Sequence, residues 1–270
     1  MNDITSYGVI GATGKVGSRV ADRLEETGAR VRRLSRGSTI AFDWEQPDSW
    51  KAALRGLDRV FVVFVPDLAS PSSAAAVSLL TEVAIEVGVS RLVLLSGRGE
   101  SGALVAEKII LESALESSIV RASWFIQNFT EGILAGSVSE GFVAVPAGDR
   151  VEPFIDVNDI ADVAVAALTA VTHEDRVIEV TGPELLTFAD AAALLSESTG
   201  HPVSYLPVSL DEFHAAISAE INTDTADLLT DMCREVFDGR NESLATGVVE
   251  TLGREPRSMR EVLAATEFAQ

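Results

Sequence analysis

Three glycines near the N-terminus, Gly11, Gly14 and Gly17, constrain this chain more than any other feature of its sequence. They follow a short apolar run at residues 7–10 and precede a stretch in which valine and leucine recur every four residues. The pattern therefore predicts a strand, a tight turn and a helix. Glycine permits a positive backbone dihedral in such a turn, close approach of a phosphate, and close packing of helix on strand. The spacing predicts a dinucleotide site with its pyrophosphate at the helix N-terminus.

The residues between the glycines complete the predicted phosphate site. Thr13 can add a hydroxyl contact, and Lys15 and Val16 stand at the start of the helix. A P-loop is excluded, because its first glycine would fall on Val9 and its hydroxyl residue on Val16. The alternative interpretation is a glycine-rich turn between strand and helix that holds no ligand.

The end of the second predicted strand indicates which dinucleotide is bound. An NAD site usually presents Asp or Glu there, to hold the ribose hydroxyls. This chain presents Ser35 and Arg36 instead. A guanidinium can fork onto the oxygens of a 2′-phosphate, and Lys15 can reach the same phosphate. The sequence therefore predicts NADPH (NADP) in preference to NAD, the alternative being that Arg36 is a solvated surface residue.

The first half of the chain alternates short apolar runs with helical patterns, which is typical of a parallel sheet covered on both faces. The expected strands are residues 7–10, 31–34, 39–42, 59–65, 91–96 and 118–121. The expected helices follow the glycine loop as far as Gly28, begin again near Pro47, and span residues 74–87 and 104–115. This order predicts an α/β, Rossmann-type, doubly wound fold.

Beyond about residue 123 helical patterns dominate. Helices are expected at residues 124–134, 159–168, 188–198 and 210–238, with short strands near 143, 154, 177–180 and 203–206. No linker rich in Pro, Gly or Ser separates the halves. We therefore expect an NAD(P)-binding core at residues 1–123 and a smaller, mostly helical C-terminal substrate lobe at residues 124–270, with interleaved segments, packed on the core as one unit.

Composition excludes several classes of partner. The formal net charge of −20 repels phosphate backbones, so no nucleic acid is expected. Acidic residues interrupt the longest apolar runs, so no membrane span is expected. The single cysteine, Cys233, cannot form an intrachain disulfide and is expected to be buried, and the first residues do not resemble a signal peptide. Together these features predict a cytoplasmic protein with a small-molecule substrate.

The residues of ordinary carbonyl reduction and of metal chemistry are missing. Short-chain dehydrogenases usually protonate a carbonyl with a Tyr-x-x-x-Lys pair, but Tyr7 and Tyr205 are followed four residues later by Gly and Ser. Ala103 and Glu107 occupy the two positions in the corresponding helix. The three histidines, His173, His201 and His214, have no metal-like spacing, so no metal is expected.

Several motifs together resemble the NmrA-like, atypical short-chain dehydrogenase/reductase group. They are the glycine loop, Ser35-Arg36, and residues 93–97, 120–129, 154–161 and 180–183. A closer match, to the branch of ergot-alkaloid reductases that contains the festuclavine and agroclavine dehydrogenases, comes from residues 42–44, 66–68, 95–100 and 238–241. The resemblance implies that Val65, Ser96 and Gly97 contact the cofactor and that Trp124, Phe125 and Asn128 line the substrate side. The alternative for Trp124 and Phe125 is simple core packing.

Two hypotheses about function follow. The first is an oxidoreductase: an NADPH-dependent reductase of a small hydrophobic imine or iminium, quinone or enone, acting by direct hydride transfer. An iminium carbon is already electrophilic, so the missing Tyr-x-x-x-Lys pair is compatible with this chemistry. The alternative is a non-catalytic NAD(P)-sensing regulator of the NmrA type that binds a protein partner. Neither hypothesis assigns a catalytic acid or base.

Overall fold

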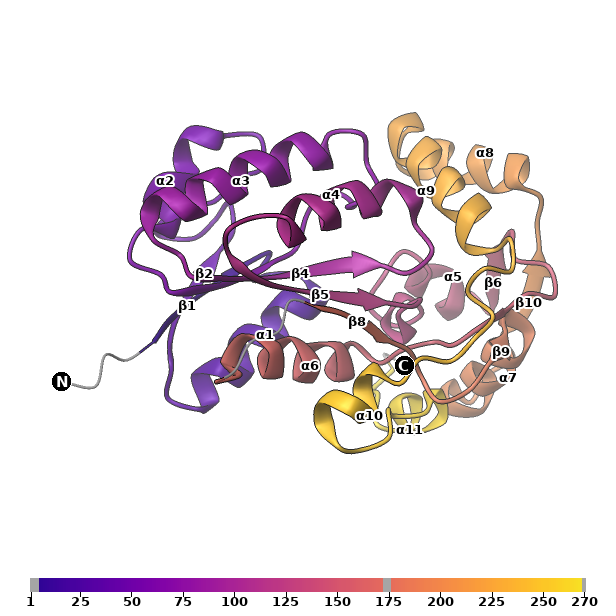
Figure 1. The fold of residues 1–270 in the computed structure, drawn as a ribbon. Helices are drawn as coiled ribbons and strands as arrows, with labels where there is room; N and C mark the ends of the chain where they lie inside the picture. The colour runs from indigo at the N-terminus through magenta and orange to yellow at the C-terminus, as the bar shows by residue number, and fades with distance from the viewer. Residues whose placement is uncertain (1–4, 172–175, 269–270) are drawn as a thin grey trace.

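The computed structural model describes residues 5–171 and 176–268 of the chain. Its largest sheet has six strands: β1 (Ser6–Ile10), β2 (Arg30–Leu34), β3 (Arg59–Val62), β4 (Arg91–Gly97), β5 (Glu116–Ala122) and β8 (Arg176–Val180). All neighbouring strands are parallel, in the order β2-β1-β3-β4-β5-β8 (Figure 1). The direction of the strand order changes at β1, which confirms the predicted α/β, doubly wound fold. In such sheets ligands bind beyond the carboxyl ends of the strands, beside the point of reversal.

Helices cover both faces of this sheet, as Figure 1 shows. One face carries α1 (Lys15–Glu26) and α6 (Val157–Thr169), and the other carries α2 (Trp50–Leu54), α3 (Ser73–Val87) and α4 (Ser101–Leu111). The side chains of β3 alternate between two apolar clusters. Phe61 packs with α1 and α6, whereas Val60 and Val62 pack with the helices opposite. A strand buried on both faces must be apolar throughout, which explains the unbroken apolar run.

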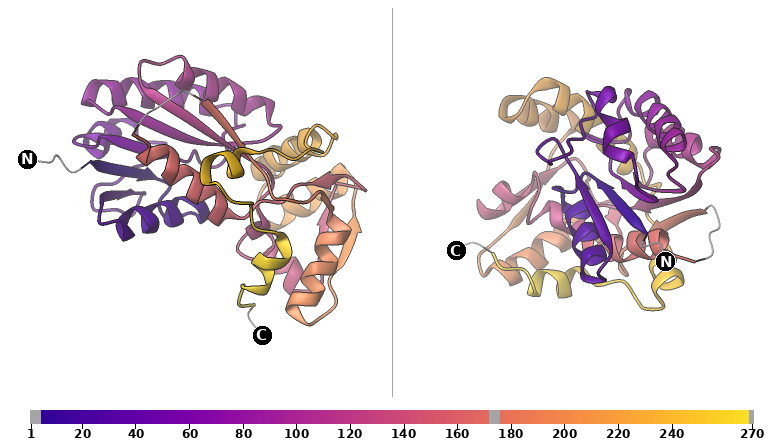
Figure 2. Two further views of the ribbon diagram at one scale, coloured as in Figure 1. Left: turned by 60° about the horizontal axis from the view of Figure 1, so that its bottom comes forward. Right: turned by 90° about the vertical axis from the view of Figure 1, so that its left-hand side faces the viewer.

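Of the remaining elements, α10 (Gly247–Leu252) packs against α6 and β8, and most of the others gather beyond the end toward which the strands point (Figures 1 and 2). These others are η2 (Ile126–Asn128), α5 (Ala135–Ser139), β6 (Phe142–Val145), β7 (Val151–Glu152), β9 (Leu186–Thr187), α7 (Phe188–Thr199), β10 (Ser204–Pro207), α8 (Leu210–Glu220), α9 (Thr223–Val236) and α11 (Met259–Ala264). Most of them share a third apolar cluster, centred on Phe188. Within the described ranges, no helix is long and apolar enough to cross a membrane.

The predicted strand at residues 39–42 does not form, and β2 stays at the edge of the sheet. The apolar residues of this stretch pack as an aromatic cluster instead. The ring of Phe42 stacks on that of Trp50, with centroids 5.6 Å apart, and meets the edge of Trp44 at 5.1 Å. The short helix η1 (Pro47–Ser49) then leads into α2. Burial of the aromatic side chains therefore decides the conformation here, and strand pairing does not.

Two predicted helices are interrupted. Residues 124–134 contain only η2, because the backbone before it pairs with Ile155: Ile155 N donates to Trp124 O at 2.9 Å, and Ile126 N donates to Ile155 O at 2.9 Å. Residues 210–238 form α8 and α9 rather than one helix, because Asn222 caps α9 by accepting a hydrogen bond from Thr225 N at 2.8 Å. Residues 177–180, expected among the short strands of the second half, lie within β8 of the main sheet.

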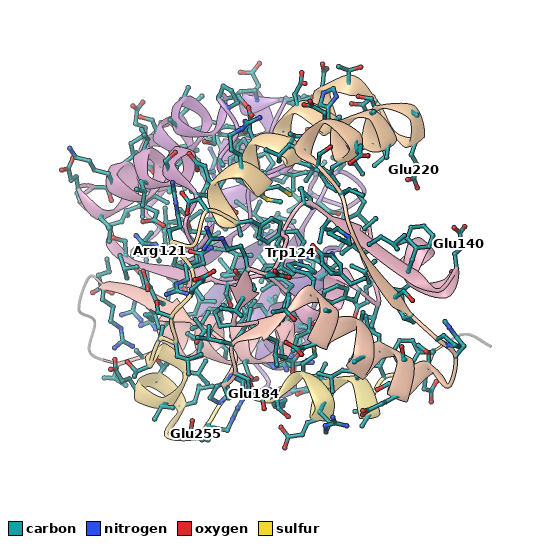
Figure 3. All side chains as sticks on the ribbon, turned by 90° about the vertical axis from the view of Figure 1, so that its right-hand side faces the viewer. Arg121, Trp124, Glu140, Glu184, Glu220 and Glu255 are labelled. Carbon is teal, nitrogen blue, oxygen red and sulfur yellow. The ribbon has the colours of Figure 1, made fainter. Side chains whose placement is uncertain are left out.

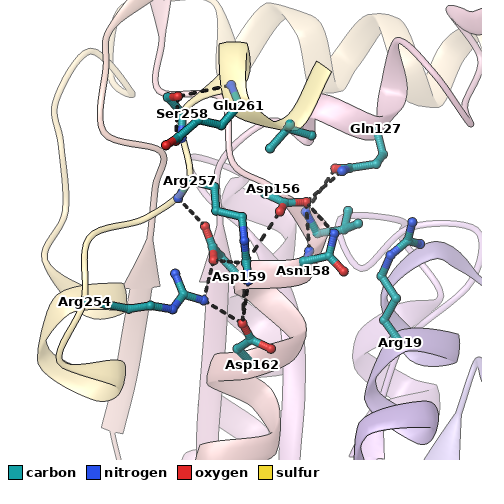
Figure 4. Close-up of polar contacts among 12 residues, drawn as sticks. Arg19, Gln127, Asp156, Asn158, Asp159, Asp162, Arg254, Arg257, Ser258 and Glu261 are labelled. Carbon is teal, nitrogen blue, oxygen red and sulfur yellow. Dashed lines mark hydrogen bonds and ion pairs between the residues drawn. The ribbon is translucent and has the colours of Figure 1, made fainter. Parts of the chain in front are cut away.

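Carboxylates on α6 hold the C-terminal segment against the sheet (Figure 4). Asp159 is fully buried, and it accepts hydrogen bonds from Arg257 N at 2.7 Å and from the Arg257 guanidinium. Arg254 contacts both Asp159, at 2.7 Å, and Asp162, at 2.6 Å. Asp162 also pairs with Arg23 of α1 at 2.5 Å. One group of ion pairs thus joins the first helix of the chain, α6 and the C-terminal segment.

The close contact between α1 and the turn after β1 leads to a testable prediction. A Cβ atom at Gly17 would stand 2.2 Å from the carbonyl oxygen of Gly11, so Gly17→Ala must displace the helix. We expect a loss of about 2–3 kcal/mol or more in the free energy of unfolding, measured by denaturant titration without cofactor. Gly136→Ala, in α5 where nothing lies within 4 Å, is the control and should stabilise the protein slightly. Equal effects of the two changes would contradict this account.

Candidate functional site

The glycine loop adopts the conformation that a phosphate site requires. Gly11, at the end of β1, has a φ of +79°, and its N–H donates to Leu34 O of β2 at 3.1 Å. Gly14 is the N-cap residue of α1, and no side chain caps this end of the helix. Thr13 and Gly14 are exposed to solvent. The first amides of α1 are therefore free to meet an anion, as the pyrophosphate of a dinucleotide would need.

Gly17 holds α1 against the turn, and Val16 beside it is buried in the core. A side chain at Gly14, in contrast, would meet only the Gly11 oxygen, at 3.4 Å. The three glycines thus have separate roles: Gly11 for backbone conformation, Gly14 for open space above the helix end, and Gly17 for packing. This space is where the sequence pattern predicts the pyrophosphate, and the residues present fit it.

Ser35 and Arg36 follow β2 beside the glycine loop. Ser35 N donates to Ser38 Oγ at 3.0 Å, and Phe42 N donates to Ser35 O at 3.0 Å, so this loop is tightly turned. Arg36 is exposed, and it forms no hydrogen bond or ion pair with any residue that the structure describes. Its guanidinium is therefore available to an external anion.

A cavity of about 390 Å³ lies between the carboxyl ends of the central strands and the C-terminal half of the chain. Six of the predicted site residues line it: Lys15, Ser96, Gly97, Trp124, Phe125 and Asn128. Most of the other lining residues are apolar and come from the loop after β3, from β4 and β5, and from α8 and α9; they include Leu68, Leu95, Phe213, Leu229, Met232 and Val236. Val65 is 54% exposed and does not line the cavity, although Phe64 and Pro66 on either side of it do.

Lys15 links the glycine loop to this cavity. Its ammonium donates to Asn128 Oδ1 at 2.9 Å. Burial lowers the pKa of Lys15, while the nearby charge of Glu131 raises it and that of Arg19 lowers it. Lys15 therefore faces the predicted substrate side, whereas Ser35 and Arg36 are not among the residues that line the cavity. The sequence-based idea that Lys15 joins Arg36 on one phosphate is not reflected in this arrangement.

Trp124 belongs to both the cavity and the core. Its ring packs on Phe237 at 5.2 Å and meets the edge of Phe188 at 5.6 Å, which makes it part of the third apolar cluster. It lies near the middle of the face seen in Figure 3. Trp124 therefore packs in the core and also lines the cavity, so the two interpretations do not exclude each other.

A buried network holds the end of β4 in place. Ser96 Oγ donates to Glu107 Oε1 at 2.6 Å. Arg121 of β5 donates to both oxygens of the same carboxylate, with Nε at 3.0 Å from Oε1, and its Nη1 donates to Glu179 Oε1 at 2.7 Å. The charge of Glu107 is thus balanced by a guanidinium. Because the hydroxyl proton of Ser96 is donated to Glu107, the Ser96 hydroxyl can only accept hydrogen bonds from a molecule in the cavity.

Sequence reasoning missed the charged residues that line this cavity, Asp67, Arg98 and Glu100. The available signal was their position: each follows closely on an apolar strand, where the carboxyl ends of parallel strands meet. It also missed the apolar side chains of α8 and α9, because their contribution depends on how the two helices fold back over the sheet.

Cys233 and the histidines lie apart from this chemistry. Cys233 is buried, as expected, and burial raises the pKa of its thiol to about 12, which keeps it a poor nucleophile. His214 contacts the exposed Asp227 at 2.7 Å. In residues 5–171 and 176–268, no group of three or more His, Cys, Asp or Glu could hold a metal ion, and His173 lies outside the described residues.

Comparison with known proteins identifies the cofactor class. A family model described as NAD(P)H-binding matches residues 11–170, from the glycine loop to the residue after α6. The chain belongs to this NAD(P)H-binding family. It is 32% identical to an NAD(P)H azoreductase from Xenophilus azovorans over 95% of this chain and 96% of that protein. It is 29% identical to agroclavine dehydrogenase from Claviceps fusiformis over 92% of each.

The fold is shared with solved structures as well. The NADPH-dependent quinone oxidoreductase of Escherichia coli, complexed with NADPH, matches with a TM-score of 0.81 at 19% identity, over 96% of this chain and 98% of that one. These findings confirm a Rossmann-type fold and membership among NAD(P)H-dependent reductases. The assignment to a particular branch, and the preference for NADPH, stay predictions.

Glu152 of β7 is buried behind Trp124, whose backbone N–H donates to its Oε1 at 3.1 Å. Burial raises the pKa of Glu152 to about 7. The amide of Trp124 and the charge of Arg98 oppose the rise, and Glu242 adds to it. The ionised form of this carboxyl is therefore unfavourable in the folded protein near neutral pH.

This pKa predicts a pH dependence of stability. The pKa of Glu152 is higher in the folded than in the unfolded chain. Its contribution to the free energy of unfolding is therefore present in acid and lost as pH rises through about 7. Glu152→Gln keeps an oxygen that can accept the hydrogen bond from Trp124 N, and it removes the group whose ionisation destabilises the folded protein as pH rises. We expect the variant to match the wild type near pH 4 and to exceed its free energy of unfolding at pH 8, by up to about 3 kcal/mol.

Denaturant titrations between pH 4 and 8 measure this difference. Glu140→Gln, at an exposed position labelled in Figure 3, is the matched control and should give a small difference at every pH. A difference between Glu152→Gln and wild type that stays constant with pH would show that Glu152 does not titrate in this range.

Proposed function

We propose that this protein is an NADPH-dependent reductase that delivers a hydride to a small hydrophobic acceptor, an imine or iminium, a quinone or an enone. The observation that carries the proposal is the cavity of about 390 Å³, with its largely apolar lining at the carboxyl ends of β4 and β5. Its size and lining are those of a site for a small, ring-containing molecule. Lys15, at the start of the helix that follows the glycine loop, is part of the same lining, so the cavity adjoins the predicted dinucleotide site.

The proposal assigns the cofactor to the chain's own residues. Gly11, Thr13, Gly14, Lys15, Val16 and Gly17 would hold the pyrophosphate, Ser35 and Arg36 the 2′-phosphate, and Val65, Ser96 and Gly97 the nicotinamide end. When bound, the reduced nicotinamide supplies the hydride. Support comes from the uncapped N-terminus of α1, the open space at Gly14 and the unpaired guanidinium of Arg36 among the described residues.

The substrate side of the proposal rests on Trp124, Phe125 and Asn128, which line the cavity. We propose that residues 1–123 act mainly as the cofactor core and residues 124–270 as the substrate lobe, although β8 and α6 of the later range complete the main sheet. The azoreductase, agroclavine dehydrogenase and quinone oxidoreductase similarities support reduction of a conjugated acceptor. A cofactor sensor of the NmrA type would have no need of this apolar cavity.

The choice of NADPH over NADH is tested at Arg36. Arg36→Ala should weaken NADPH binding at least tenfold, because a guanidinium that neutralises the 2′-phosphate is lost, and should change NADH binding little. Both dissociation constants can be measured by cofactor fluorescence or calorimetry. Arg30→Ala removes the same charge at the exposed opposite end of β2 and is the matched control. Equal losses for NADPH and NADH would remove the assignment.

The reductase itself is tested by NADPH consumption with cyclic imines, quinones and enones. We expect oxidation with at least one of these acceptor classes, and none with Gly14→Val, whose side chain would fill the pyrophosphate space without disturbing β1 or α1. The unfolding curve of Gly14→Val should match that of the wild type. Tight binding of NADPH and NADP without turnover of any acceptor would instead favour the cofactor sensor.

A further inference from the structure

Two carboxyl groups line the cavity without a role in the proposed hydride transfer. Asp67 stands in the loop after β3, and Glu100 is the residue immediately before α4. Both therefore lie at the carboxyl edge of the sheet, where the acceptor is proposed to bind. Their side chains lie within hydrogen-bonding reach of each other, and two carboxyl groups can form such a bond only when one of them carries a proton.

The Glu100 carboxyl is buried without a cation to balance it. Its residue is only 9% exposed, and no N–H or hydroxyl in the described part of the chain donates a hydrogen bond to it. Glu107, within α4, is 3% exposed and is held by the Arg121 guanidinium. A buried carboxylate needs a cation or several donors to stay ionised, so the surroundings of Glu100 favour its protonated form.

The position of Glu100 is fixed against the strand end predicted to meet the nicotinamide. A Cβ atom at Gly97 would stand 2.1 Å from Glu100 Oε1, so the carboxyl occupies the space directly beside the Gly97 backbone that a side chain there would take. The backbone of the next residue is tied to α9, because Ser101 N donates to Glu235 Oε2 at 2.8 Å. The carboxyl is thus held in the cavity wall by β4 on one side and by the substrate lobe on the other.

The charges around Glu100 favour its protonated form. Burial raises the pKa of Glu100 well above its usual range, and the acidic neighbours Asp67, Glu235 and Glu107 add to the rise. Burial also raises the pKa of Asp67, against the hydrogen bond from Ala69 N. The basic residues that share a cavity wall with Glu100 are Lys15, Arg98, Arg121 and Arg240. All four are already engaged by other oxygen acceptors.

A second cavity adjoins Glu100, and its lining does not include Asp67. It has a volume of about 360 Å³, and Glu100 lines it as well as the first. Its other walls include the guanidinium groups of Arg121 and Arg240 and the half-exposed side chain of Leu104. Glu100 therefore stands between an apolar chamber and a polar one that reaches the surface.

We propose that Glu100, hydrogen-bonded to Asp67, is the proton donor of this reductase and that its acceptor is a neutral conjugated carbonyl compound, a quinone or an enone. The inference rests on the proposed function and narrows it. An iminium cation needs no proton when it receives a hydride, whereas a carbonyl acceptor gains a proton on oxygen. A protonated carboxyl in the cavity wall serves the second kind of acceptor.

The step balances in atoms and charge. Both electrons enter the acceptor with the hydride, so the carboxyl pair is neither oxidised nor reduced. The O–H bond of Glu100 breaks as a new O–H bond forms on the acceptor oxygen. The pair is then left with two negative charges in a buried setting, and it regains one proton from water through the second cavity.

The first test compares Glu100→Gln with the wild type in steady-state reduction of a quinone or enone by NADPH. The amide has the shape of the acid but cannot transfer its proton, so kcat should fall about a hundredfold or more, with NADPH binding unchanged. Glu82→Gln, an exposed position on α3, is the control and should leave kcat unchanged. Equal kcat values for Glu100→Gln and wild type would overturn the donor role while leaving the reductase intact.

The second test needs no turnover. The infrared difference spectrum between the cofactor-free wild type and Glu100→Gln at pH 7–8 should contain the C=O band of a protonated carboxyl. Glu152, which also holds a proton in this range, is present in both proteins and cancels in the difference. Asp67→Asn removes the like charge, so it should move the loss of this band, and the alkaline fall of kcat, to lower pH. A difference spectrum without the band, or a band whose pH dependence Asp67→Asn leaves unchanged, would refute the shared proton. If no acceptor is reduced, the proposed function fails first, and the band still reports whether the pair holds its proton.

Discussion

The contact between Gly17 and the carbonyl of Gly11 is the constraint on which the site depends. It brings α1 so close to the end of β1 that no side chain fits between them. The same approach leaves the N-terminus of α1 uncapped and turned toward solvent, and directs Lys15 to Asn128 across the cavity. The geometry proposed to receive a dinucleotide is thus a consequence of backbone packing before any side chain takes part.

Burial sorts the acidic groups at the carboxyl edge of the sheet into two kinds. Glu107 is paired with Arg121 and serves as a fixed anchor for Ser96. Glu100 and Asp67 have no cation beside them among the described residues, and both have raised pKa values. Both glutamates are buried, so the main difference between them is that an arginine from a neighbouring strand reaches Glu107 and none reaches Glu100.

The sequence predicted well whatever depended on local pattern. The central strands and the helix faces follow from periodicity. Ser96, Trp124 and Asn128, to which the resemblance gives cofactor and substrate roles, line one cavity, and those roles stay predictions. The sequence failed where tertiary contacts override pattern. Phe42 packs on Trp50 instead of extending a strand, and the backbone of Trp124 pairs with Ile155 instead of starting a helix.

Asp67 and Glu100 could not be assigned from sequence alone for a related reason. In the described part of the fold, no cation lies beside them to balance a negative charge. This can be seen only when the packed structure is known.

The ion pairs of Asp159 also bear on how the chain is made. This buried carboxylate, on a helix that covers the main sheet, is balanced by Arg254 and Arg257 from the C-terminal segment. During synthesis α6 emerges from the ribosome long before these arginines do. Until they arrive, docking of α6 would bury an unpaired charge, which is strongly unfavourable. The sheet is therefore expected to gain its final packing only after Arg254 and Arg257 have left the ribosome.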